Sequence, residues 1–283
     1  MINYRSVDDL SRLIKSKLHL IPDVDCIAGV PRSGMLAASL IALYLGKPLI
    51  SIEDIGKGDY NNFTSRIKLF CKSTRVLIVD DSCSSGNAMK RVKNILSTIK
   101  NKEFIYCAIY VLESSKQYVD FWFETLEHLR LFEWNIMDHG ILGQSCVDLD
   151  GILCIDPTYE ENDDGEKYKR FLLNAQPRFI PQRKIGTIVT CRLEKYRPET
   201  VQWLEKHNVK YNDLIMMNYA TADERRAANC YSSYKAAIYK QTNAQLFIES
   251  NSKQAFDIFC FTNKPVYCPD NGFYNLGYTR NMI

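Results

Sequence analysis

The chain of 283 residues contains, at positions 76–88, the run Val76-Leu77-Ile78-Val79-Asp80-Asp81-Ser82-Cys83-Ser84-Ser85-Gly86-Asn87-Ala88. Its four apolar, mostly β-branched residues predict a buried strand, and the apolar positions of residues 87–100 recur at helical spacing. A strand, a short polar loop and a helix present main-chain N–H groups and a helix N-terminus to one point, which suits a phosphate. The serines add hydroxyl donors, and Gly86 lets the backbone approach a ligand closely. The run therefore predicts a phosphate-binding loop in an α/β domain.

Two aspartates precede this loop, although a bare phosphate cradle would repel them. We therefore expect a ligand that carries hydroxyls or a metal beside its phosphate, and ribose 5-phosphate meets that description. The run resembles the diphosphoribosyl-binding signature of type I phosphoribosyltransferases: four apolar residues, two acids, two variable positions, two small hydroxyl or acidic residues and glycine. The resemblance implies that Asp80 and Asp81 orient the ribose hydroxyls of phosphoribosyl pyrophosphate (PRPP). It assigns the 5-phosphate to Ser82, Cys83, Ser84, Ser85 and Gly86.

A second strand-loop-helix unit comes earlier in the chain. Residues 25–30 predict a strand, Pro31-Arg32-Ser33-Gly34 a loop, and residues 35–45 an apolar helix. The resembling family binds the pyrophosphate of PRPP here, and a guanidinium such as that of Arg32 matches phosphate oxygens. Family members also place a mobile lid in the region of residues 55–72, where the candidate ligand contacts are Lys57, Tyr60, Arg66 and Lys68.

The acceptor base is expected to lie over the segment that follows the strand predicted at residues 104–112. The aromatic side chains of Phe121, Trp122 and Trp134 are candidates to stack on a flat base, as in the 6-oxopurine enzymes. Those enzymes read the purine with a lysine where this chain has Glu113, and they carry an aspartate where it has Ser84. A glutamate accepts hydrogen bonds, so we expect Glu113 either to face N–H groups of the base or to act as general base.

Composition narrows the function classes. A hydrophobic share of 46% and a net charge of +3, with acids and bases interspersed, indicate a soluble globular protein and favour neither a nucleic-acid nor a membrane partner. The ten cysteines fall singly without a CxxC motif, and no apolar signal segment opens the chain, so we expect reduced cysteines and a cytoplasmic location. The length predicts two domains.

The second half restarts the strand pattern at Cys146-Val147-Asp148-Leu149-Asp150-Gly151. It resembles the first motif of the haloacid dehalogenase (HAD) superfamily, which implies Asp148 as nucleophile and Asp150 as acid/base. The later motifs of that family fall on Thr190 and Arg192 as phosphate or substrate contacts, on Lys235 (or Lys240) as the neutralising lysine, and on Glu249, an acid where the family usually has aspartate. The implied Mg²⁺ ligands are Asp148, Asp150 and Glu249, because carboxylate attack on phosphorus needs charge neutralisation. Only about 35 residues separate Asp150 from the threonine strand, so any cap is small, and the acidic stretch 160–166 is expected to be a solvated loop.

The sequence thus predicts two doubly wound, mainly parallel α/β domains, residues 1–140 phosphoribosyltransferase-like and residues 141–283 HAD-like. The expected function is bifunctional: transfer of phosphoribose from PRPP to a nucleobase-like acceptor, and Mg²⁺-dependent removal of phosphate from the product or a related phosphate monoester. Two alternatives stay open, a regulatory protein that senses PRPP or a nucleotide, and a HAD phosphatase whose first domain only binds a ligand. Members of the first family often form homodimers.

Overall fold

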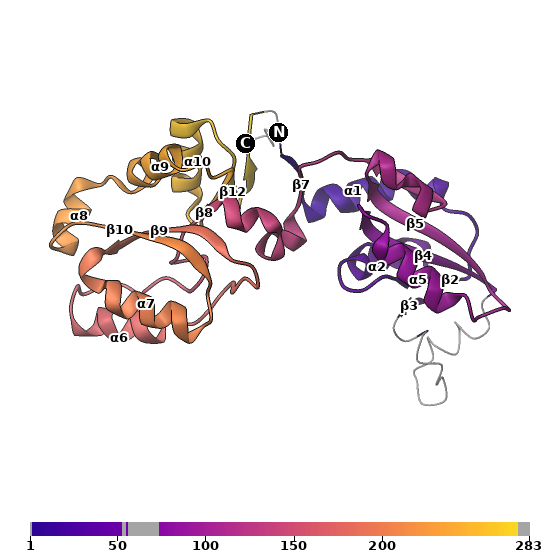
Figure 1. Ribbon diagram of the computed structural model, residues 1–283, viewed down its shortest axis with the longest axis horizontal. Helices are drawn as coiled ribbons and strands as arrows, with labels where there is room; N and C mark the ends of the chain where they lie inside the picture. The colour runs from indigo at the N-terminus through magenta and orange to yellow at the C-terminus, as the bar shows by residue number, and fades with distance from the viewer. Residues whose placement is uncertain (1, 53–54, 56–73, 277–283) are drawn as a thin grey trace. The chain divides into compact units, whose positions relative to one another are not determined.

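The computed structural model describes residues 2–52, 55 and 74–276 of the chain. By compactness the chain divides into two units, Met1–Asn135 and Ile136–Ile283. Each unit is built on a mainly parallel sheet with helices, as expected for the α/β class (Figure 1). None of the helices in the described ranges is both long enough and apolar enough to cross a membrane. The four candidate lid contacts, Lys57, Tyr60, Arg66 and Lys68, lie outside the described residues.

The first unit carries a five-stranded sheet in the order β3-β2-β4-β5-β6 and a separate pair, β1 with β7. All of these pairings are parallel. The strands are β1 (Asn3–Arg5), β2 (Cys26–Gly29), β3 (Leu49–Ser51), β4 (Arg75–Cys83), β5 (Glu103–Val111), β6 (Phe121–Thr125) and β7 (Arg130–Phe132), and the helical segments are α1 (Val7–Lys17), η1 (Leu18–Leu20), α2 (Gly34–Leu45), α5 (Asn87–Leu96) and η2 (Glu113–Tyr118).

β4 is the central strand, and its apolar side chains alternate between two helix layers. Val76 and Ile78 pack in one cluster with apolar residues of α5, whereas Leu77 and Val79 pack in another with residues of α1 and α2. A strand that is apolar on both faces is typical of a parallel sheet covered on both sides. The predicted loop follows the carboxyl end of β4, so it lies at the carboxyl edge of this covered sheet.

The ends of β4 and α5 differ by several residues from the sequence prediction. The strand was predicted over the apolar residues 76–79 and the loop after the two aspartates, but β4 continues through both aspartates to Cys83, which pairs with Val111 of β5. The prediction placed the strand end too early because it followed apolar side chains, whereas the ladder needs only main-chain groups. The following helix ends at Leu96 rather than at residue 100, because the Ser97 N–H turns to the Asn94 carbonyl.

The second unit carries a six-stranded sheet in the order β10-β9-β8-β11-β12-β13, in which only the β12–β13 pairing is antiparallel. A turn of 3₁₀-helix, η3 (Glu133–Asp138), runs across the unit boundary. The strands are β8 (Ser145–Val147), β9 (Ile185–Leu193), β10 (Tyr211–Met217), β11 (Leu246–Ile248), β12 (Val266–Cys268) and β13 (Gly272–Tyr274), and the helical segments are η4 (Gly140–Gln144), α6 (Glu166–Asn174), η5 (Glu194–Tyr196), α7 (Arg197–Lys206), α8 (Ala222–Ala228), α9 (Tyr231–Gln241) and α10 (Ser252–Thr262).

Helices again cover both faces of this sheet, α6 and α7 on one side and α9 and α10 on the other (Figure 1). The segment between β8 and β9 contributes α6, which packs on α7; there the buried indole of Trp203 donates to the Ala175 carbonyl oxygen at 2.8 Å. The acidic stretch 160–166 is not wholly solvated, as had been expected. The carboxylate of Asp164 is only 18% exposed because it accepts hydrogen bonds from Lys195 Nζ, Tyr196 Oη and Ala222 N.

Candidate functional sites

The two aspartates of β4 lie together in the first unit. Asp80 and Asp81 are 7% and 4% exposed, and Asp80 Oδ1 accepts from the Asp81 N–H at 3.0 Å. Burial raises the pKa of both carboxyls, and the charge of Asp81 raises the pKa of Asp80 further. Buried carboxyls are costly unless donors meet them, so this pair suits a ligand that brings its own hydroxyl donors.

The loop after β4 is short and partly open. Ser84 and Ser85 are exposed, whereas Cys83 and Gly86 are buried. Gly86 begins α5 in the left-handed conformation, at φ +72°, and a β-carbon there would lie 2.2 Å from the Tyr118 ring. Glycine is therefore required on both grounds, since other residues rarely adopt this φ and no side chain fits. The N-cap residue Gly86 has no side chain to cap α5, and only a long contact of 3.4 Å joins the Asn87 N–H to Ser85 Oγ, so the first N–H groups of the helix suit an anion.

The loop Pro31-Arg32-Ser33-Gly34 reaches the same edge of the sheet. A β-carbon on Gly34 would lie 2.8 Å from the Val79 carbonyl oxygen and 2.9 Å from Asp80 Oδ1, so only glycine permits this approach. The Asn135 side chain ties the loop down, because its Oδ1 accepts from Arg32 Nη2 at 3.0 Å and from Ser33 Oγ at 3.3 Å. The structure therefore brings the two loops predicted to bind PRPP against the same pair of aspartates.

The residues predicted to bind the base are not brought together in this way. Phe121 and Trp122 are neighbours on β6 and pack into different apolar clusters. Glu113 is largely exposed and forms an ion pair with Lys116 at 2.6 Å. Trp134 does reach the aspartates: its indole Nε1 donates to Asp81 Oδ2 at 2.8 Å, while its ring stacks on Phe132 at 5.0 Å.

A buried lysine organises the site of the second unit. Lys235, on α9, is 2% exposed, and its Nζ lies 2.8 Å from Asp148 Oδ2 and 2.6 Å from Glu249 Oε2. The acids follow β8 and β11, neighbouring parallel strands whose carboxyl ends meet at one edge. Burial and the Glu249 charge raise the pKa of Asp148, while Lys235 opposes this effect. The two acids raise the pKa of Lys235 despite its burial, so the lysine is charged.

Asp150 is held by Arg192 rather than by the lysine. Arg192 Nε lies 3.1 and 3.0 Å from the two carboxylate oxygens, and Nη2 lies 2.6 Å from Oδ1. The arginine is fully buried on β9, where its Nη1 also donates to Thr200 Oγ1 at 3.3 Å. Such a forked contact fixes both position and orientation of a carboxylate. Arg192, predicted to contact substrate, is thus placed behind Asp150.

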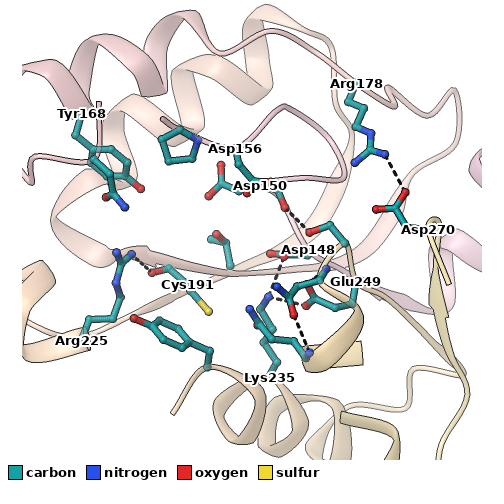
Figure 2. Close-up of a pocket in the computed structure, with 17 residues that line it drawn as sticks. Asp148, Asp150, Asp156, Tyr168, Arg178, Cys191, Arg225, Lys235, Glu249 and Asp270 are labelled. Carbon is teal, nitrogen blue, oxygen red and sulfur yellow. Dashed lines mark hydrogen bonds and ion pairs between the residues drawn. The ribbon is translucent and has the colours of Figure 1, made fainter. Parts of the chain in front are cut away.

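These side chains surround a cavity of about 440 Å³ (Figure 2). Its lining includes all five residues predicted as catalytic or metal-binding in this half of the chain: Asp148, Asp150, Thr190, Lys235 and Glu249. Arg192 and Lys240, both of which the structure describes, are not among the residues that line the cavity. The predicted lysine is therefore the one that reaches the acids.

Mg²⁺ fits this donor set only in part. Nowhere in residues 2–52, 55 and 74–276 are three or more His, Cys, Asp or Glu side chains arranged to hold one metal ion. The side chain of Asp150, an expected ligand, is engaged by Arg192. Asp148 Oδ2 and Glu249 Oε2 contact Lys235, so the other carboxylate oxygens of these two residues would have to hold the ion together with waters and substrate oxygens.

Several residues at these sites were missed by sequence reasoning. Asn135 follows the predicted aromatic Trp134 and looked like an ordinary polar residue. Arg225 lines the cavity of the second unit at 9% exposure, yet its context, Glu224-Arg225-Arg226, is typical of a solvated helix face. Tyr168 also lines the cavity, and burial raises the pKa of its hydroxyl. No spacing or motif distinguishes these residues, because the fold alone brings them to the sites.

Comparisons with known proteins give partial similarity. No family model matches the chain, and no curated protein is significantly similar to it. A xanthine-guanine-hypoxanthine phosphoribosyltransferase structure from Helicobacter pylori aligns with 16% identity over 48% of this chain and 93% of its own, at a TM-score of 0.38. A purine phosphoribosyltransferase from Pyrococcus horikoshii aligns with 20% identity over 47% of this chain and 93% of its own, at a TM-score of 0.37. UMP synthase from Leishmania donovani aligns with 19% identity over 40% of this chain and 24% of its own, at a TM-score of 0.29. At these TM-scores the similarity does not by itself establish a family or an activity for this chain.

Proposed function

We propose that the chain is bifunctional, with a PRPP-binding phosphoribosyltransferase unit followed by a Mg²⁺-dependent phosphohydrolase unit of the HAD type. One observation carries the proposal. In each unit a pair of aspartates lies at the carboxyl end of a central parallel strand and meets groups suited to phosphate, the Gly34 and Gly86 loops in the first and Lys235 with Thr190 in the second. Ligands of parallel α/β sheets bind at this edge.

In the first unit, Asp80 and Asp81 accept the ribose hydroxyls and so fix the sugar. The N-terminus of α5 and the loop hydroxyls hold the 5-phosphate, and the loop with Arg32 holds the pyrophosphate. Mg²⁺, when bound with PRPP, neutralises pyrophosphate charge. The base nitrogen attacks C1 as the bond from C1 to the pyrophosphate oxygen breaks, and the protein contributes mainly orientation and electrostatic stabilisation.

In the second unit, Asp148 attacks the phosphorus of a phosphate monoester, and the bond from phosphorus to the ester oxygen breaks. Asp150, positioned by Arg192, is the proposed acid/base group: it passes a proton to the departing oxygen and takes one back from the water that hydrolyses the acyl phosphate. Lys235 opposes the rise in the pKa of Asp148 and attracts the phosphate, and the Thr190 hydroxyl donates to a phosphate oxygen. Mg²⁺, when held by Asp148 and Glu249, lowers the repulsion between carboxylate and phosphate.

The positions of the residues predicted to bind the base favour a second candidate function. Glu113 is largely exposed, and Phe121 and Trp122 pack into different apolar clusters, so these residues predicted to bind the base do not form one stacking platform. This favours a first unit that binds PRPP or a nucleotide without transferring the sugar. The second unit would then be a phosphohydrolase under ligand control.

The test incubates the protein with PRPP, Mg²⁺ and a panel of purine, pyrimidine and pyridine bases, and follows pyrophosphate and inorganic phosphate with products identified by mass. Asp80→Asn and Asp148→Asn are compared with Asp8→Asn and Asp213→Asn, which change exposed aspartates of the respective units. Loss of pyrophosphate release only in Asp80→Asn, and of phosphate release only in Asp148→Asn, supports two activities. PRPP binding without consumption of any base supports the second candidate. If neither product forms and PRPP does not bind, both are refuted.

A further inference from the structure

Most of the charged side chains around the cavity of the second unit form ion pairs, although the carboxylate of Asp156, which also lines it, is outside these pairs. The pairs are Lys235 with Asp148 and Glu249, Arg192 with Asp150, and Arg178 with Asp270. Arg225 is the cation that departs from this pattern. It lines the cavity at 9% exposure, yet none of the described residues forms an ion pair with it. A guanidinium buried without a counter-ion is costly, so a site that keeps one is expected to receive an anion.

The position of Arg225 is fixed beside the predicted phosphate-binding strand end. It lies on α8, and its Nη1 donates to the Cys191 carbonyl oxygen at 2.7 Å, next to Thr190. Its Nε is buried without a hydrogen-bond partner among the described residues, whereas the rest of the guanidinium has the Cys191 carbonyl and the Tyr168 hydroxyl as polar neighbours. Figure 2 shows Arg225 on the Cys191 and Tyr168 side of the cavity, with Asp148 and Lys235 elsewhere on the wall.

The phosphate that reacts at Asp148 already has Lys235 and Thr190, and a cavity of about 440 Å³ is much larger than one phosphate group. We propose that Arg225 binds a second anionic group of the substrate, a phosphate or a carboxylate, so that the site selects phosphate monoesters that carry two anionic groups. This inference rests on the proposed phosphohydrolase activity. Arginine suits the role because its planar fork matches both kinds of anion.

The test uses substrate pairs that differ by one anionic group: ribose 5-phosphate with ribose 1,5-bisphosphate, and glycerol 3-phosphate with 3-phosphoglycerate. p-Nitrophenyl phosphate provides the baseline. Arg225→Met is compared with Arg226→Met, which changes the next residue of the same helix, an arginine 48% exposed and paired with Asp223. Arg225→Lys tests whether charge alone is enough.

We expect the native protein to prefer the doubly anionic member of at least one pair, and the bisphosphate and carboxylate arms tell which anion is recognised. Arg225→Met should raise KM for that member about 10- to 100-fold, the range of a charge-assisted hydrogen bond, and leave KM for p-nitrophenyl phosphate and the Arg226→Met kinetics unchanged. Equal effects on both members of every pair, or no preference in the native protein, would overturn the inference.

Binding separates this inference from the proposed activity. Asp148→Asn removes the proposed nucleophile, and stabilisation of this variant against heat by each pair is measured with and without Arg225→Met. If nothing is hydrolysed but the doubly anionic ligand stabilises only the protein that keeps Arg225, the proposed activity is wrong and the anion site stands. If p-nitrophenyl phosphate is hydrolysed and Arg225→Met alters no binding, the anion site is wrong and the activity stands.

Discussion

Removal of the Lys235 charge should destabilise the second unit strongly. The lysine is 2% exposed and lies within 2.8 Å of two carboxylates that are 5% and 0% exposed. Lys235→Met keeps the volume but leaves Asp148 and Glu249 as like charges without a counter-ion. Two unit charges about 4 Å apart interact by about 4 kcal/mol at an effective dielectric constant of about 20. Loss of one partner from buried ion pairs costs about 3–5 kcal/mol, and we expect that loss in the free energy of unfolding.

The assay is urea unfolding at pH 7 with a chelator present, so that no divalent cation replaces the lost charge. Trp122→Phe and Trp134→Phe leave Trp203, buried on α7, as the fluorescent reporter of the second unit. The control is Lys240→Met, because Lys240 is exposed on the same helix and should change stability by less than about 0.5 kcal/mol. Adding Asp148→Asn to Lys235→Met should restore part of the loss. If Lys235→Met costs no more than Lys240→Met, Lys235 is not the residue that neutralises the acids.

Three further predictions address other parts of the molecule. Arg192→Lys keeps the charge but not the forked contact to Asp150. Steady-state kinetics should show the phosphohydrolase kcat reduced about 10- to 100-fold, with KM little changed and an altered pH dependence of kcat. An unchanged pH dependence would show that Arg192 does not position the acid. Gly34→Ala places a β-carbon 2.8 Å from the Val79 carbonyl oxygen, so the free energy of unfolding of the first unit should fall by about 1–3 kcal/mol. Calorimetry should also show weaker binding of PRPP. Native affinity for PRPP would contradict the role of this loop. Hydrogen bonds from Arg75 N, Thr74 N and Thr74 Oγ1 lower the pKa of Asp25 from 3.8 to about 2, so its contribution to stability is present above about pH 4 and disappears as the pH falls toward 2. In Asp25→Asn the urea concentration at the unfolding midpoint should therefore change less between pH 4 and pH 2 than in the native protein. The same pH dependence in both proteins would refute this prediction.

The sequence predicted the elements that carry one strong apolar pattern. Residues 76–79 are all apolar because side chains on both faces of this strand are buried, and the structure places them alternately in two apolar clusters. The apolar positions of α5 pack into one of these clusters. The end of β4 was wrong, because the main-chain ladder continues beneath polar side chains that predict a loop. Periodicity reports what side chains bury, so it does not reveal where main-chain pairing stops.

The candidate sites divide along the same line. Asp148, Thr190, Lys235 and Glu249 were singled out at strand ends and on one helix, and the structure brings them to one cavity. Arg225 reaches that cavity from a helix with an ordinary charged sequence, so only the folded chain reveals it. Glu113 and Trp134 were predicted to contact the base, but their positions in the chain did not predict their actual partners. Glu113 pairs with Lys116, and Trp134 donates to Asp81.

The contact between Trp134 and Asp81 gives the first unit an optical reporter. Indole emission depends on the hydrogen bond and the field at its N–H group, and here that group donates to a carboxylate assigned to the ribose hydroxyls. A ribose that occupies the site competes for the same oxygen atoms and changes the indole environment. On the proposed assignment of Asp81, we expect ribose binding to change the emission of Trp134, the residue that sequence reasoning had assigned to stacking on the base.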